Sequence, residues 1–156
     1  IFQVSLLAFI PYGLAALLVY PWSLWASKNR QIGVFAGISM VIAAIGLTGA
    51  VVFFSYSILV AMGFLCLAAI GIYTAVPCFL SMPANISTGA AAAAGLAVVS
   101  SIGNIGGFVA PWVVGLLKDI SSSNTPGLLF LALSLLLTGL LCIFYCAKQR
   151  EGVIHS

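Results

Sequence analysis

The chain has 156 residues, of which 63% are hydrophobic and 4% are charged. A soluble domain is about 25% charged, so this composition excludes a soluble enzyme. It also excludes a disordered chain, which needs low hydrophobicity and high charge. The net charge of +3 comes from five Lys and Arg against two acids, too few for a nucleic-acid-binding patch. The composition therefore indicates an integral membrane protein.

Five apolar segments are long enough to cross a bilayer, whose core of about 30 Å needs roughly 20 helical residues. Pro11 and Pro21 predict kinks in the first segment. Only residues 55–57 mark the break between the second and third segments, but one helix over both would be too long for a single crossing. We therefore predict an all-α fold of five transmembrane helices at about 1–26, 32–54, 57–80, 90–117 and 128–147.

Polar and turn-forming residues fill the predicted connections. Residues 27–31 are a short charged loop, 81–89 are a polar link with a proline, and 118–127 are the most hydrophilic stretch. Ser87 or Thr88 is predicted to N-cap the fourth helix, because a side-chain hydroxyl can accept a hydrogen bond from its first free amides.

The positions of Lys and Arg predict the orientation, because cytoplasmic loops carry an excess of both. With the carboxyl terminus in the cytoplasm, only Lys118 lies outside, and the inside receives Lys28, Arg30, Lys148 and Arg150. Trp22 and Trp25 lie beside the first basic loop, where interfacial aromatic residues are expected. We predict a multi-pass protein of the plasma membrane (the inner membrane of a bacterial cell), surrounded by the lipid bilayer.

None of the five predicted spans contains Asp, Glu, Lys, Arg or His. Intramembrane charges usually mark ion paths or proton relays, so these spans have no such element of their own. They also lack an acid pair and a Ser–His arrangement, so we predict that the protein is not an enzyme. The only histidine is His155 in the tail, and the four cysteines lie in apolar runs without CxxC spacing, so no metal or cofactor is expected.

The fourth span carries a row of small residues at multiples of four. The row consists of Gly103, Gly107, Pro111 and Gly115. In lipid, such a row lets a neighbouring helix approach closely, so these residues are candidates for helix packing. Gly33 and Gly37 in the second span form another small pair, for which helix packing is also expected.

Asn104 lies in the middle of the fourth span, and Ser100 lies one turn before it on the same face. An amide there needs a hydrogen-bond partner, because hydrocarbon offers none. Two interpretations stay open: the pair joins helices, or it faces a water-filled cavity and contacts a polar solute. Tyr12, Tyr73 and Thr74 are further candidates for solute contact, because they share their spans with mid-span prolines, which are typical of the broken helices at transporter binding sites. The alternative for each proline is a kink in a helix that only packs.

Residues 95–111, which contain Gly103-Asn104 and Gly106-Gly107-Phe108, closely resemble the eleventh helix of major facilitator transporters. More narrowly, they resemble the anion:cation symporter family, which includes permeases for phthalate, hexuronate and tartrate. Residues 67–83 resemble the tenth helix and the following link of that family, and Ile10-Pro11-Tyr12 resembles a motif of its eighth helix. On this alignment the chain covers helices eight to twelve and lacks the first seven.

The resemblance implies a twelve-helix transporter of two halves, with alternating access around a central site. Family members usually keep their substrate-binding Arg and proton-coupling acid in the amino-terminal half, in agreement with the uncharged spans of this chain. The chain is then a fragment of the carboxyl-terminal half, whose partners are a small organic anion, a coupling cation (proton or sodium) and the missing amino-terminal half. Asn104 is the best single candidate for substrate contact.

Three positions depart from the family pattern. Leu80 stands where a Trp is frequent, Ser100 stands for the Asn of an Ile-Asn-Ser triplet, and Lys28-Asn29-Arg30 follows Ser27 where an Asp-Arg pair is usual. The leading hypothesis is ion-coupled symport of a carboxylate or sugar acid. The alternative is a non-catalytic membrane subunit or scaffold whose Gly- and Asn-rich helix only packs against other helices.

Overall fold

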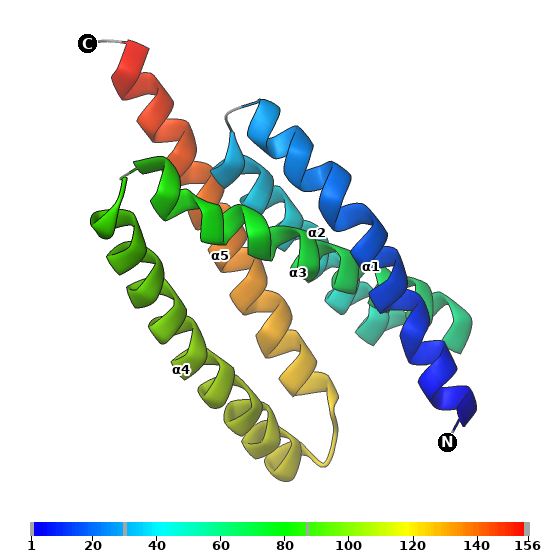
Figure 1. Ribbon diagram of the computed structural model, residues 1–156. Coiled ribbons are helices and arrows are strands. Elements are labelled where there is room, and N and C mark those ends of the chain that lie inside the picture. The colour runs from blue at the N-terminus through cyan, green and yellow to red at the C-terminus, as the bar shows by residue number, and fades with distance from the viewer. Residues whose placement is uncertain (1, 30, 87, 155–156) are drawn as a thin grey trace.

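The computed structural model describes residues 2–29, 31–86 and 88–154, with side chains for all of these except 2–10, 83–86, 147 and 149–154. It contains five helices (Figure 1). They are α1 (Phe2–Lys28), α2 (Ile32–Phe53), α3 (Ile58–Ile86), α4 (Ala90–Ser121) and α5 (Thr125–Ile154). The described residues contain no strand, and the predicted all-α fold is confirmed.

Four of these helices are long and apolar enough to cross a membrane. The four segments are Ile32–Phe53, Ile58–Met82, Ala90–Ser121 and Thr125–Cys146. The first predicted span coincides with α1, whose residues 2–10 have side chains outside the described set. The chain is therefore a multi-pass membrane segment, and the break predicted at residues 55–57 is present between α2 and α3.

The link before α4 is shorter than predicted. Helix α3 continues to Ile86, so the prediction of a non-helical segment was wrong for residues 81–86. Gly89 is the N-cap of α4, with φ +64° and no side-chain capping hydrogen bond, so the prediction of Thr88 as the cap was also wrong. Ser87 lies outside the described residues. A positive φ favours glycine, so a backbone reversal at Gly89 begins α4.

The hydrophilic stretch after α4 is also more helical than predicted. Helix α4 runs past Lys118 to Ser121, and Ser122 ends it in the left-handed region with φ 55°. The Ser123 hydroxyl then accepts a hydrogen bond from the Thr125 amide at 3.2 Å, at the start of α5. The connection between the two helices is thus reduced to residues 122–124.

Helix α2 packs against α3 through small residues that let the two backbones approach closely. A Cβ atom added at Gly46 would lie 2.5 Å from the Ala68 nitrogen. One added at Gly71 would lie 2.5 Å from the Ser39 carbonyl oxygen and 2.6 Å from the Ala43 nitrogen. Both glycines therefore sit where a side chain would collide with the backbone of the facing helix.

Helix α2 packs against α5 in the same way. A Cβ at Gly37 would lie 2.7 Å from the Gly139 carbonyl oxygen, and one at Gly139 would lie 2.9 Å from the Gly37 carbonyl oxygen. One turn earlier, Gly33 lies against the Cys146 side chain. The packing role predicted for Gly33 and Gly37 is confirmed.

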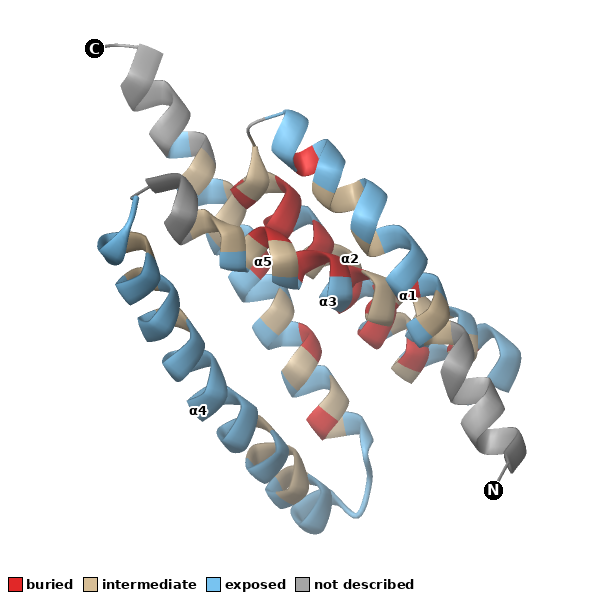
Figure 2. Cartoon of the chain, viewed as in Figure 1, coloured by how far each residue is buried: buried red, intermediate tan, exposed pale blue. Residues whose placement is uncertain are grey.

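Helix α2 is thus the centre of the fold, with α3 and α5 packed on it. Helix α1 lies mainly on α3, whereas α4 stands apart and touches only α3 and α5 (Figure 1). Among its described residues α4 has none that is buried, and Figure 2 shows the buried residues concentrated in α2 and α3. The five helices therefore leave one whole face of α4 open.

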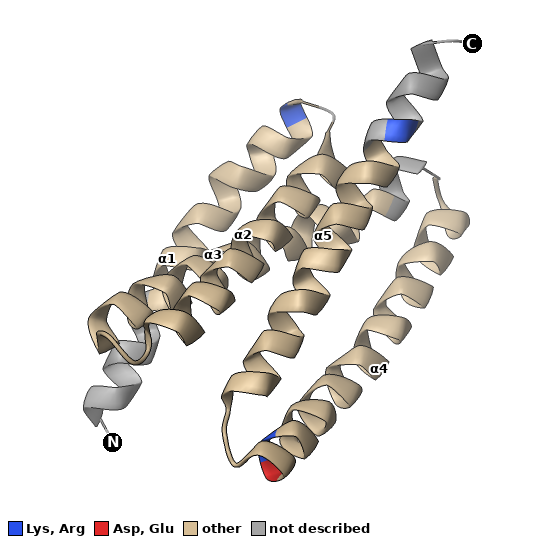
Figure 3. Cartoon of the chain, turned by 180° about the vertical axis from the view of Figure 1, so that it is seen from behind, with Lys and Arg blue, Asp and Glu red and all other residues tan. Residues whose placement is uncertain are grey.

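The charged residues lie at the two ends of the helices. Lys28 is in the last turn of α1, Lys118 is in the last turn of α4 with Asp119 beside it, and Lys148 is in α5. Figure 3 shows basic residues of α1 and α5 at one end of the helices, and basic and acidic residues of α4 at the other end. The charged residues are therefore arranged as expected for groups on the two sides of a membrane. Arg30 and the side chain of Arg150 lie outside the described residues, and the assignment of the ends to cytoplasm and exterior stays a prediction.

Candidate functional site

Two of the predicted site residues, Tyr12 and Tyr73, lie in direct contact. Their ring centroids are 5.7 Å apart, with the planes at 76°, an edge-to-face arrangement. The contact follows from the packing of α1 on α3. Both side chains stay about half exposed, at 56% and 45%, so the pair presents two phenol rings at the surface of the α1–α3 layer.

Thr74 follows Tyr73 in sequence but lies on another face of α3, where it is 3% exposed. Its hydroxyl donates to the Ile70 carbonyl at 2.7 Å and lies 3.2 Å from the Gly71 carbonyl. The hydrogen of Thr74 is thus held by its own helix. Its role in solute contact stays a prediction.

Most serine and threonine hydroxyls in the spans also donate to a backbone carbonyl of their own helix. The hydroxyls that donate to the carbonyl four residues earlier are those of Ser39, Thr48, Ser101, Ser134 and Thr138, at 2.8–2.9 Å. A serine or threonine in a helix can always satisfy its hydrogen in this way. An asparagine amide carries two donors and an acceptor, so the same local bond cannot satisfy it completely.

Asn104 is exposed on α4 and has no hydrogen-bond partner among the described residues. Ser100, one turn earlier, is exposed as well. Hydrocarbon cannot supply a partner for the amide. The face of α4 that carries Asn104 must therefore meet water, a solute or a polar group outside the described helices.

The glycine row of α4 is also open. A Cβ atom added at Gly103, Gly107 or Gly115 would meet no described atom within 4 Å, and Pro111 is exposed. Packing at this row therefore requires a partner other than the described parts of α1, α2, α3 and α5. The predicted packing role of these four residues stays a prediction.

The tyrosine pair lies on α1 and α3, and of these two helices only α3 contacts α4. Within the described chain, α1 and α4 have no contact with each other, and α3 contacts both. The described residues also hold no group of three His, Cys, Asp or Glu side chains that could bind a metal ion. The arrangement offers phenol, hydroxyl and amide groups, which can donate and accept hydrogen bonds.

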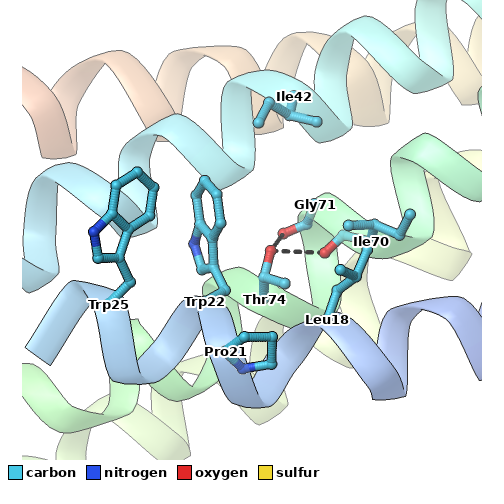
Figure 4. A pocket seen from close by; sticks show the side chains of 8 residues that line it. All are labelled: Leu18, Pro21, Trp22, Trp25, Ile42, Ile70, Gly71 and Thr74. Atoms are coloured by element: carbon cyan, nitrogen blue, oxygen red, sulfur yellow. Dashed lines mark hydrogen bonds between the residues drawn. The ribbon is translucent and has the colours of Figure 1, made fainter.

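A cleft that was not predicted from the sequence lies between α1, α2 and α3 (Figure 4). Its volume is about 440 Å³ and its surface is almost wholly apolar. The lining residues are Leu18, Pro21, Trp22, Trp25, Ile42, Ile70, Gly71 and Thr74. The spacing of the four α1 residues, at i, i+3, i+4 and i+7, was the available signal, because it places them on one face of the helix.

No family model and no solved structure matches this chain. Curated relatives do match it over almost its whole length. It is 35% identical over 96% of its length to a putative tartrate transporter of Agrobacterium vitis, covering 34% of that protein. It is 32% identical over the same share to a quinolone resistance transporter of Acinetobacter baumannii, again covering 34%. It is likewise 32% identical over 96% to the inner membrane transport protein RhmT of Escherichia coli (strain K12), covering 34%.

All three relatives are named as transport proteins. The resemblance to major facilitator transporters is therefore confirmed over nearly all of the chain. The chain spans about a third of the length of these relatives.

Proposed function

We propose that this chain forms part of the carboxyl-terminal half of a secondary transporter that carries a small organic anion across the plasma membrane by ion-coupled symport. The spans described above would supply one wall of a central cavity. The coupling cation is a proton or a sodium ion, and the groups that bind it lie in the amino-terminal half. The carboxyl terminus is cytoplasmic, in agreement with Lys28 and Lys148 at one end of the helices.

The observation that carries the proposal is the exposed, unpartnered amide of Asn104. The described spans satisfy most of their hydroxyls inside their own helices, so an amide left open in the middle of α4 marks a surface with a polar neighbour. A carboxylate or sugar acid in water is such a neighbour. The amide N–H groups of Asn104 donate to carboxylate oxygens, and the exposed phenols of Tyr12 and Tyr73 provide donors on α1 and α3.

The names of the relatives support the substrate class. One relative is a putative tartrate transporter, and tartrate is a dicarboxylic hydroxy acid. Another is named for quinolone resistance, and quinolone drugs also carry a carboxylate. Tartrate and the quinolones that these names mention share a carboxylate, so we propose a carboxylate as the group that this site recognises.

The test is uptake of labelled tartrate and a panel of sugar acids by cells that express the full-length protein. Asn104→Ala is expected to lower uptake at least tenfold, because it removes a hydrogen bond to a charged group worth about 1.5–3 kcal/mol. An uncoupler that collapses the ion gradient is expected to abolish accumulation. Ser100→Ala is expected to reduce uptake less, because it removes one neutral hydroxyl.

Ser101→Ala is the matched control. Ser101 lies beside Ser100 on the same helix, but its hydroxyl donates to the Ala97 carbonyl at 2.8 Å, so its loss leaves uptake unchanged. If Asn104→Ala transports normally, the substrate-contact role is wrong. If it instead fails to reach the membrane in folded form, the amide joins helices, as in the alternative of a non-catalytic scaffold.

A further inference from the structure

We propose that the cleft between α1, α2 and α3 binds one acyl chain of an anionic phospholipid, whose phosphate contacts Lys28. This site is distinct from the α4 face and the tyrosine pair, and its occupant does not depend on the transported solute. The ligand class is a glycerophospholipid with net negative charge, such as phosphatidylglycerol.

The cleft is present because α1 packs against one neighbouring helix much more closely than against the other. Helix α1 packs mainly on α3 and touches α2 only slightly, so a space stays open between α1 and α2, with α3 as its floor. Leu18, Trp22 and Trp25 of α1 face Ile42 of α2 across this space (Figure 4). Its volume of about 440 Å³ lies in the range of ligand sites, about 300–1,000 Å³.

The chemistry of the lining selects an apolar ligand. Apart from the two indoles, the lining has one polar side chain, that of Thr74. Its hydroxyl donates to carbonyl oxygens of its own helix. A charged solute would lose its hydration in this cleft, and the lining residues carry no charged side chain to replace it, which is costly. A hydrocarbon chain loses nothing on entering it, and the surrounding bilayer supplies such chains.

A cation lies at the membrane-surface end of the cleft. Lys28 is in the last turn of α1, three residues after Trp25, and it is exposed. The i, i+3 spacing continues the face formed by Pro21, Trp22 and Trp25. An ammonium group above an apolar cleft matches a phospholipid, whose phosphate lies directly above its acyl chains, and basic groups between membrane helices bind anionic head groups.

A second observation concerns the indole of Trp22. Its Nε1 atom is buried and has no hydrogen-bond acceptor among the described residues, although buried Trp N–H groups usually have one. Lys28 lies six positions after Trp22 on the helix, a rise of about 9 Å. The ester carbonyls of a phospholipid are acceptors, and they lie below its phosphate, on the side of Lys28 where Trp22 lies.

The experiment uses the full-length protein purified in detergent. Native mass spectrometry counts bound phosphatidylglycerol and phosphatidylcholine during a titration. A phosphatidylglycerol with a diazirine on one acyl chain is then photolysed, and its adducts are mapped on peptides. The expected result is one tightly bound phosphatidylglycerol, with adducts on α1 between Leu18 and Trp25 and on α2 near Ile42.

Two variants test the two halves of the site. Lys28→Gln is expected to weaken phosphatidylglycerol binding about fivefold, the effect of about 1 kcal/mol for one Lys near an anionic lipid. Lys118→Gln, at the other end of the helices, is its control and leaves binding unchanged. Ile42→Phe fills the cleft and is expected to remove the adducts, whereas Ile45→Phe changes an exposed residue of the same helix outside the cleft and keeps them.

Equal binding of both lipids, or adducts spread evenly over the lipid-facing helices, would overturn the proposal. Retained adducts in Ile42→Phe would do the same. Because Lys28 is exposed at a helix end, Lys28→Gln leaves the fold intact and tests the charge contact even if Ile42→Phe does not fold. Uptake measurements are separate, so the outcome here is independent of the proposed transport function.

Discussion

The ring of Tyr12 meets the ring of Tyr73 edge to face, with centroids 5.7 Å apart and planes at 76°. This contact ties α1 to α3 at a point where both side chains remain about half exposed. It therefore fixes the direction of two phenol groups that the proposed cavity would use. A site built on a rigid pair of helices holds its geometry better than one on a loop.

The tyrosine pair predicts a measurable coupling energy. A double-mutant cycle of Tyr12→Leu and Tyr73→Leu is expected to give a coupling of about 1 kcal/mol, because edge-to-face aromatic pairs contribute about 0.5–1.5 kcal/mol beyond their buried area. The free energy of unfolding is measured by SDS titration of the purified full-length protein. A cycle of Tyr20→Leu with Tyr73→Leu is the control, since these two rings share no contact. A coupling near zero for the first pair contradicts the contact.

Gly37→Ala is expected to destabilise the protein by about 1–3 kcal/mol, because overpacking a tight interface forces the helices apart. The added methyl group would lie 2.7 Å from the backbone oxygen of Gly139, and backbone cannot move aside. The same SDS titration measures the loss. Gly63→Ala is the matched control: no described atom lies within 4 Å of its Cβ position, so it is expected to be neutral or stabilising by about 1 kcal/mol.

Gly89→Ala is expected to cost about 1–2 kcal/mol, because Gly89 has φ +64°, where a Cβ atom is strained. Thr88→Ala is expected to change the unfolding free energy by less than about 0.5 kcal/mol, since no side chain caps α4. Thermal unfolding of both variants measures how much each residue contributes to the stability of the protein. A loss of about 1 kcal/mol in Thr88→Ala, typical of a removed N-cap, would contradict the observed helix start.

Ser122→Gly and Ser123→Gly are expected to have opposite signs. Ser122 has φ 55°, so glycine there relieves strain and raises the unfolding free energy by about 1 kcal/mol. Ser123 accepts a hydrogen bond from the Thr125 amide, so its loss removes the partner of the first amide of α5 and costs about 1 kcal/mol. Thermal unfolding of the two variants side by side is the measurement, and equal shifts would contradict the geometry of this turn.

The sequence predicted the class of the fold because hydropathy is a local property. A run of about 20 apolar residues must form a helix in lipid, whatever its neighbours, since every backbone group needs an internal partner. The five spans and the all-α class followed from this rule. The helix ends were less accurate: α3 continues to Ile86 and α4 begins at Gly89, because competing ends differ by only about 1 kcal/mol.

Only the tertiary structure decided which glycines pack. Gly33 and Gly37 of α2 and Gly103 and Gly107 of α4 show the same spacing in the sequence. The first pair meets α5, whereas the second pair meets no described atom within 4 Å. Spacing determines which residues share a helix face, but a contact also needs a second helix on that face, and that depends on the placement of α4 away from α2.

The candidate site also combines features that the sequence predicted with features that only the packing of the helices determined. The sequence alone identified Asn104 as the amide that lipid cannot satisfy, because that conclusion needs only its position within a span. The contact of Tyr12 with Tyr73, the burial of Thr74 and the cleft lined by Ile42 all depend on how α1, α2 and α3 pack together. Such relationships join residues far apart in the chain, so packing decides them and local pattern does not.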